Sequence, residues 1–326
     1  MRQIDLLQSD AIERESLERV IENATEKIIH SGKVTKKQTR DSFERARDIT
    51  IGSRGTRRVE NESASRRQLL GDTDRRSNDA LEAIVLERHR PAWFVENDSI
   101  EIFNNEEVGE YPDLQLIRDK KVELEQLIKR LGRVDLINHY HNFVGTGWLI
   151  EKDIVVTNAH VAREFCKLDR YSGWDFEATA TGDLVEARID TLRQRRTDQS
   201  RDRRLEILEV LYVAGEGESD IAFFRVENDE NLAPLELDTK VYTNRIPVAA
   251  IGYPAKDSRN DPVLMRRLFG VDYNVKRFSP GYIQSFDQSM QEYIGDYSTL
   301  GGNSGSAVFS LENLKVVGLH LSLIHI

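Results

Sequence analysis

The chain has 326 residues, of which 39% are hydrophobic and 31% are charged, so it is long enough for two domains or for one two-lobed domain with an appendage. Its 46 Lys and Arg against 56 Asp and Glu give a net charge of -10, which argues against nucleic-acid binding. No apolar stretch is long enough to span a membrane, and the first ten residues do not resemble a signal peptide. The single cysteine, Cys166, excludes an internal disulfide and favours a cytoplasmic location, and its apolar neighbours predict a buried, unreactive thiol.

The N-terminal part of the chain falls into two segments. Residues 1–51 predict a helical N-terminal segment, because apolar residues between Ile12 and Ile28 recur at spacings of three to five. Residues 52–79 are dominated by Arg, Glu, Asp, Ser, Asn and Gly, which predicts a polar linker. Its Arg pairs leave RNA contact as an alternative, but the interleaved acids favour a solvated linker.

Residues 80–137 predict a small α/β or helical adaptor region. We expect a short helix over residues 78–88 and strands at Ala92–Val95 and Ile100–Phe103, followed by a helix that Asp113 caps and Gly132 ends. Oligomerisation, autoinhibition and recruitment of a protein partner through the N-terminal helices all remain open as roles for the region before residue 138.

From residue 138 onwards the sequence consists of short apolar runs separated by turn residues. We predict strands at residues 143–150, 154–157, 185–192, 205–213, 221–226, 248–251, 281–286, 306–309 and 316–321. Many short strands at this spacing are typical of an antiparallel barrel or sandwich, so residues 138–326 form the main, mainly β domain.

Three residues in this domain indicate nucleophilic catalysis. His160 follows two strands, Asp220 directly precedes the apolar run 221–224, and Ser304 lies in a glycine-rich turn before a strand. A serine hydroxyl needs a base such as imidazole within hydrogen-bond reach, and a buried carboxylate orients that base. Each residue alone reads as a core histidine, a turn acid or a loop serine, but their joint occurrence in this order favours a catalytic triad.

The glycines beside Ser304 predict an oxyanion hole. They let the backbone turn so that the N–H groups of Gly302 and Ser304 converge on one point. Loss of one such donor typically costs about 3 kcal/mol of barrier. The same turn lacks the lysine of a phosphate-binding loop and precedes a strand, so nucleotide binding is set aside.

This combination resembles the trypsin-like (chymotrypsin-fold) serine peptidases, in particular the bacterial branch with Gly-Asn-Ser-Gly around the nucleophile that includes HtrA-type and glutamyl endopeptidases. The resemblance covers residues 143–320 and implies two six-stranded antiparallel barrels with the triad of His160, Asp220 and Ser304 at their junction. It implies hydrolysis of protein or peptide substrates through an acyl-enzyme, without a metal or an organic cofactor.

The resemblance also implies which residues line the primary specificity pocket. In the glutamyl endopeptidases, a Thr or Ser before the glycine pair and a His in a later strand help to hold the substrate carboxylate. Thr299, with Ser298 beside it, and His320 match these positions, so we expect cleavage after acidic residues. The alternative, that Thr299 caps a turn and His320 packs against the barrel, stays equally open.

The sequence departs from the family pattern where it ends, at Ile326, because the family continues with a pocket wall, a last strand and a helix. We therefore expect a C-terminally truncated domain with an incomplete second barrel, and weak or no activity of this fragment. A second hypothesis is a protease-fold binding or signalling module that is recruited through its N-terminal helical region. The pair His139 and His141 suggests metal binding, but no further ligand at a suitable spacing accompanies it, which favours surface or packing histidines.

Overall fold

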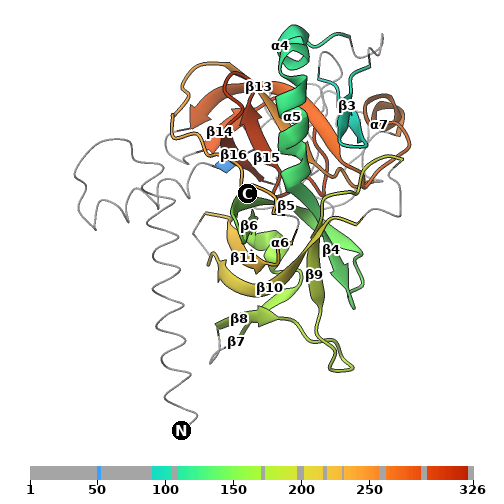
Figure 1. The fold of residues 1–326 in the computed structure, drawn as a ribbon, viewed down its shortest axis with the longest axis vertical. Helices are drawn as coiled ribbons and strands as arrows, with labels where there is room; N and C mark the ends of the chain where they lie inside the picture. Colours follow the sequence, from blue (N-terminus) through green and yellow to red (C-terminus); the bar gives the residue numbers. More distant parts are fainter. Residues whose placement is uncertain are drawn as a thin grey trace, which may run out of the picture.

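The computed structural model of the chain describes residues 50–52, 90–103, 109–169, 173–196, 202–215, 219–229, 231–256, 262–287 and 292–321. The expected helical segment 1–51, the linker 52–79 and the helix 78–88 lie outside this part, except for residues 50–52. These three residues form a short strand and not the expected helix and linker. The described part is mainly β, with two groups of strands one above the other (Figure 1). No helix within it is long and apolar enough to cross a membrane.

The first group is a closed antiparallel barrel of six strands. Its order around the barrel is β10, β11, β6, β5, β4 and β9. The bounds are β4 Leu131–Ile137, β5 Phe143–Glu151, β6 Ile154–Thr157, β9 Glu186–Asp190, β10 Arg204–Val213 and β11 Ala222–Val226. Strand β6 is buried along its whole length, as its β-branched sequence Ile-Val-Val-Thr predicts.

Strand β4 corrects the expectation for the segment before residue 138. Gly132 does not end a helix there; it is the second residue of β4, and this strand closes the barrel between β5 and β9. A Cβ atom at Gly132 would lie 2.4 Å from Cγ2 of Ile189 on β9, so close strand packing requires the glycine. The first barrel therefore begins at Leu131.

The second group is an eight-stranded sheet in the order β12, β15, β16, β1, β14, β13, β2 and β3. The bounds are β1 Thr50–Gly52, β2 Trp93–Glu96, β3 Ser99–Glu101, β12 Ile246–Gly252, β13 Arg277–Asp287, β14 Glu292–Gly295, β15 Ala307–Ser310 and β16 Val316–Leu321. Because β12 also pairs with β13, six of these strands form a ring.

The sequence predicts an incomplete second barrel, because the family's last strand would follow the segment that ends at Ile326. In the structure, β1 pairs with β16 instead. Strand β1 pairs in parallel with both β14 and β16, so a segment far away in the sequence stands between them. The expected strands at Ala92–Val95 and Ile100–Phe103 correspond to β2 and β3, which pair antiparallel with each other, and β2 joins the ring through β13.

The helical segment 114–130 is broken into three short pieces. They are α4 Leu114–Asp119, α5 Lys121–Leu127 and the 3-10 turn η1 Ile128–Arg130. Asp113 does stand at the N-terminal cap of α4, but its carboxylate accepts a hydrogen bond from the Tyr282 hydroxyl and caps no backbone N–H. The apolar sides of these helices join one core with both strand groups.

The remaining elements are two helices and a hairpin. They are α6 Ala159–Ala162, α7 Pro262–Phe269, β7 Cys166–Asp169 and β8 Gly173–Phe176, with β7 and β8 paired at the free end of the first barrel (Figure 1). Cys166 is buried as expected, and burial raises the pKa of its thiol.

Candidate active site

His160 is held by the end of a buried strand. Strand β6 ends at Thr157, and the one-turn helix α6 starts at Ala159, so His160 occupies the first turn after the barrel. The Asn158 side chain between them donates a hydrogen bond of 3.0 Å to the backbone oxygen of Asp220. This contact joins the histidine segment to the segment before β11.

Asp220 reaches His160 because β11 pairs antiparallel with β6, with Ala222 opposite Thr157. One carboxylate oxygen accepts a hydrogen bond of 2.9 Å from the His160 backbone N–H, and the other lies 2.5 Å from His160 Nδ1. Two contacts from one carboxylate fix both the ring orientation and the tautomer, with Nδ1 protonated towards Asp220. The other ring nitrogen, Nε2, is then the one available to act as a base.

Ser304 lies in a tight turn before β15. The turn is built on two glycines in the left-handed region, Gly302 at φ +84° and Gly305 at φ +85°. The Leu300 carbonyl accepts hydrogen bonds from the backbone N–H (3.1 Å) and the side-chain amide (2.9 Å) of Asn303. Asn303 therefore stabilises the turn, which leaves Ser304 buried at its apex.

The first barrel holds this turn through Thr146 on β5. The Thr146 N–H donates to the Ser304 carbonyl (2.8 Å), and its hydroxyl donates to the Gly302 carbonyl (3.0 Å). Its own carbonyl accepts a hydrogen bond of 2.7 Å from the Thr157 hydroxyl. Thr146 thus ties the serine turn to the two strands that carry the histidine.

Gly145, next to Thr146, shows how closely the histidine and serine segments meet. A Cβ atom there would lie 2.8 Å from Cγ2 of Val161 and 3.0 Å from the Ser304 carbonyl oxygen. The neighbour of His160 and the backbone of Ser304 therefore contact the same point on β5. The structure brings the three expected catalytic residues to one junction of the two strand groups.

The peptide bond between Gly301 and Gly302 has a defined orientation. The Gly301 carbonyl accepts a hydrogen bond of 2.6 Å from the Ala255 N–H in the second strand group. The N–H of Gly302 lies in the same peptide plane and consequently points in the opposite direction to the Gly301 carbonyl. Within the described part of the chain, neither this N–H nor that of Ser304 donates a backbone hydrogen bond, as two oxyanion donors require.

The three expected pocket residues are all buried, but they have different surroundings. The Ser298 hydroxyl donates to the Arg90 carbonyl (2.8 Å), so it serves the backbone of a distant segment. His320, on β16, packs edge-on against Tyr297 with ring centroids 5.6 Å apart, and its Nδ1 lies 3.4 Å from the Tyr297 hydroxyl. Tyr297 gives no local sequence signal beyond that of a tyrosine near a turn, so its place beside His320 emerges only from the structure.

His320 is uncharged at neutral pH. Burial and the nearby charge of His160 lower its pKa to about 3. His320 lies beside the serine turn as well, because its N–H donates to Ser306 and its carbonyl accepts from Gly305. Any contact that it makes with a substrate is therefore that of a neutral imidazole.

His139 and His141 lie at the tip of the turn between β4 and β5, where both rings contact Tyr140 in a tilted arrangement. The residues that the structure describes contain no group of three or more His, Cys, Asp or Glu side chains arranged to hold a metal ion. The three rings of His139, Tyr140 and His141 contact one another.

The fold and the junction define a mainly β protein in which His160 and Asp220 are in contact and the turn that carries Ser304 lies against the same strand, where two strand groups touch. A family model described as "Trypsin-like peptidase domain" matches residues 145–319, more than half of the chain. The chain belongs to this family of trypsin-like peptidases.

Solved structures offer distant similarities. The chain is 16% identical to a serine endoprotease from Yersinia pestis, with a TM-score of 0.37, and the match covers 67% of this chain and 58% of that one. It is also 16% identical to Deg5, with a TM-score of 0.42 and coverage of 68% and 88%. No curated protein matches the chain.

Proposed function

We propose that this chain is a serine endopeptidase that cleaves peptide bonds with Ser304 as nucleophile, His160 as general base and Asp220 as the orienting carboxylate. The observation that carries the proposal is the pair of contacts from Asp220 to the backbone and ring of His160, at the junction where a glycine-built turn presents Ser304. A barrel that served only as a scaffold would not need a carboxylate aligned in this way.

In this mechanism His160 Nε2 accepts the Ser304 proton while the serine oxygen attacks the scissile carbonyl. The N–H groups of Gly302 and Ser304 stabilise the oxyanion of the tetrahedral intermediate. The protonated histidine then gives its proton to the leaving amine, and water hydrolyses the acyl-enzyme by the reverse sequence. Asp220 stabilises the imidazolium ion in both halves of the reaction.

For the substrate, we propose cleavage after acidic residues, with Thr299 and His320 in the primary pocket. The neutral His320 accepts from Tyr297 at Nδ1, which leaves the Nε2 proton to donate to a substrate carboxylate. Ser298 is bound to the Arg90 carbonyl and shapes the pocket floor through that contact.

A fluorophosphonate probe tests the catalytic proposal, because it forms a covalent bond only with an activated serine. We expect mass spectrometry to find the label on Ser304, and labelling to disappear in Ser304→Ala and His160→Ala. Ser285→Ala, at an exposed position on β13, is the matched control and should label as the parent does. A protein that takes up no label, or that takes it up at another serine, contradicts the proposal.

The proposed specificity is tested with two fluorogenic peptides that differ only in Glu or Gln before the scissile bond. We expect kcat/KM to be higher for Glu, and the ratio to fall towards one in His320→Val. A parent protein that cleaves the Gln peptide as well as the Glu peptide, or better, contradicts the acidic preference and leaves the catalytic proposal intact.

A further inference from the structure

A half-buried arginine on β4, Arg133, lies near the serine turn without being part of the expected site. Its side chain is 12% exposed, and its Nε and Nη2 both donate to the carboxylate of Asp135, which is 4% exposed. This forked pairing fixes the plane of the guanidinium group. One donor, Nη1, and the face of the group are left to contact other residues.

The remaining donor of Arg133, Nη1, leads to the carbonyl of the Gly301–Gly302 peptide, called the oxyanion peptide here because its N–H is a proposed oxyanion donor. Arg133 Nη1 donates to the Asn274 carbonyl (3.0 Å), and the Asn274 N–H donates to the Pro254 carbonyl (2.9 Å). Pro254 directly precedes Ala255, whose N–H holds the Gly301 carbonyl at 2.6 Å. A short series of hydrogen bonds thus runs from Arg133 to the Gly301–Gly302 peptide.

The face of the guanidinium group leads to the same peptide by a second route, through an aromatic ring. Its central carbon lies 4.6 Å from the centroid of the Phe143 ring, a cation–π contact. Cε2 of Phe143 lies 3.1 Å from the point that a Cβ atom on Gly302 would occupy. The ring therefore covers Gly302 directly, and Arg133 holds the ring in place.

We propose that Arg133 is a positioning residue for the oxyanion hole: through Phe143 and through Asn274 it fixes the Gly301–Gly302 peptide with the Gly302 N–H facing the reacting carbonyl. The inference rests on the proposed function. A peptide flanked by two glycines rotates easily, and rotation would turn the N–H away from the oxyanion. Two independent contacts from one rigid guanidinium group oppose this rotation before the substrate arrives.

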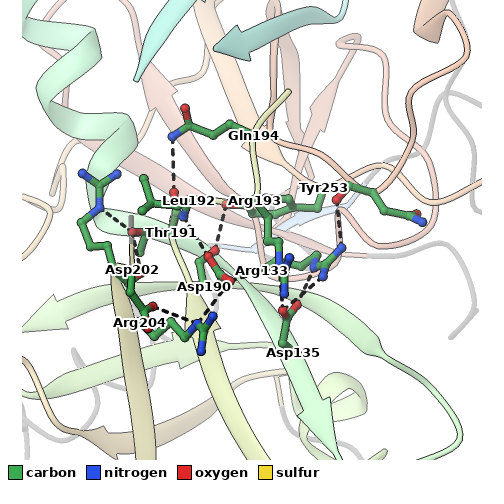
Figure 2. Close-up of polar contacts among 12 residues, drawn as sticks. Arg133, Asp135, Asp190, Thr191, Leu192, Arg193, Gln194, Asp202, Arg204 and Tyr253 are labelled. Carbon is green, nitrogen blue, oxygen red and sulfur yellow. Dashed lines mark hydrogen bonds and ion pairs between the residues drawn. The ribbon is translucent and has the colours of Figure 1, made fainter. Parts of the chain in front are cut away.

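The ion-pair cluster around Arg133 supplies a matched control (Figure 2). Arg193 shares Asp135 with Arg133 through a contact of 3.0 Å and also pairs with Asp190 at 3.0 Å. Its side chain is 42% exposed, and among the described residues it makes neither a hydrogen bond to the Asn274 carbonyl nor a cation–π contact with Phe143. Loss of Arg193 perturbs the same cluster but not the oxyanion peptide.

The test compares Arg133→Met, Arg133→Lys and Arg193→Met in the full chain. For Arg133→Met we expect kcat to fall about 10- to 100-fold with KM within about twofold, since a displaced oxyanion donor weakens transition-state binding. Arg133→Lys, which keeps a donor for Asn274, should recover part of the loss. Arg193→Met should keep kcat within about twofold of the parent.

A second readout separates positioning from general stability. A peptide boronic acid forms a tetrahedral adduct with the serine, so its affinity should fall by the same factor as kcat in Arg133→Met. The affinity for the product peptide, which makes no oxyanion, should stay unchanged. Phe143→Leu, which leaves the ion pairs intact, should reproduce the effect if Arg133→Met does not fold.

Three outcomes would overturn the inference. One is a kcat of Arg133→Met within twofold of the parent. The second is an equal loss in Arg193→Met, and the third is a loss of affinity for product and boronic acid alike. If the parent protein neither labels at Ser304 nor hydrolyses peptides, the proposed function itself fails and this inference fails with it.

Discussion

Gly305, the residue after Ser304, tests how tightly the two strand groups enclose the serine turn. It has φ +85°, and a Cβ atom there would lie 2.1 Å from the Thr146 carbonyl oxygen and 2.5 Å from the Thr157 hydroxyl oxygen. Both atoms are fixed, since the Thr157 hydroxyl donates to that same carbonyl. Gly305→Ala therefore forces β5 and the turn apart.

The expected cost has two parts. An alanine in the left-handed region costs about 1–2 kcal/mol of folding free energy. Overpacking against fixed neighbours adds about 1–3 kcal/mol. Gly173 has nearly the same backbone angle, φ +84°, but no atom lies within 4 Å of a Cβ there, so Gly173→Ala should show the first part alone.

Urea unfolding followed by tryptophan fluorescence measures both variants against the parent protein. We expect Gly305→Ala to lose about 2–5 kcal/mol and Gly173→Ala about 1–2 kcal/mol. Equal losses would refute the reasoning, because they would show that the turn has room beside Thr146. Labelling of Ser304 by the fluorophosphonate should be lost only in Gly305→Ala.

Three further predictions concern ionisable groups. Burial, assisted by the charge of Arg203, lowers the pKa of Lys276 to about 7. Between pH 7 and about pH 10 the unfolded chain therefore binds one more proton at this lysine than the folded chain, and the free energy of unfolding rises with pH. Urea unfolding at pH 7, 8 and 9 should show a smaller rise of this free energy in Lys276→Met than in the parent, and an equal rise would contradict the prediction. Asp98 forms a forked ion pair with Arg203. Burial alone would raise the pKa of Asp98, but hydrogen bonds from Arg203 and Gln194 outweigh burial and lower the pKa to about 2. The pair therefore stabilises the fold fully above about pH 4, and this stabilisation is lost as the pH falls towards 2. Asp98→Asn should cost about 3–5 kcal/mol at pH 7, and a loss below 1 kcal/mol would show that the pair is not desolvated. Because the pKa of His320 is about 3, the ratio of Glu to Gln cleavage should stay constant between pH 6 and pH 8, and a fall of that ratio near pH 6.5 would show that a charged histidine binds the substrate.

Local sequence patterns predicted the elements that fill the core. The expected strands at residues 154–157 and 316–321 have the same bounds in the structure, because continuous apolar or β-branched runs have no other favourable environment. Strand β4 was missed because Gly132 resembles a helix stop, and only its contact with Ile189 on β9 explains the glycine. Strand β14 is short and gains its pairing from β13, which no local pattern reveals.

The candidate site shows the same division. His160, Asp220 and Ser304 lie next to strands that the sequence predicts, since each of these strands is strongly patterned. The contacts that orient the serine turn come from Thr146 and Ala255, which lie far from Ser304 in the sequence. Their residue types are common in barrels, so only the pairing of distant strands identifies their role.

The shared core of the helices α4 and α5 with both strand groups has a practical consequence for anyone who wishes to shorten this protein. A fragment cut at residue 138, where the β-rich texture of the sequence starts, would lose β4 and open the first barrel between β5 and β9. It would also strip Leu114, Ile117 and Leu124 from the common core. Because β1 also closes the second ring between β14 and β16, the smallest fragment worth expressing from this chain starts no later than Thr50.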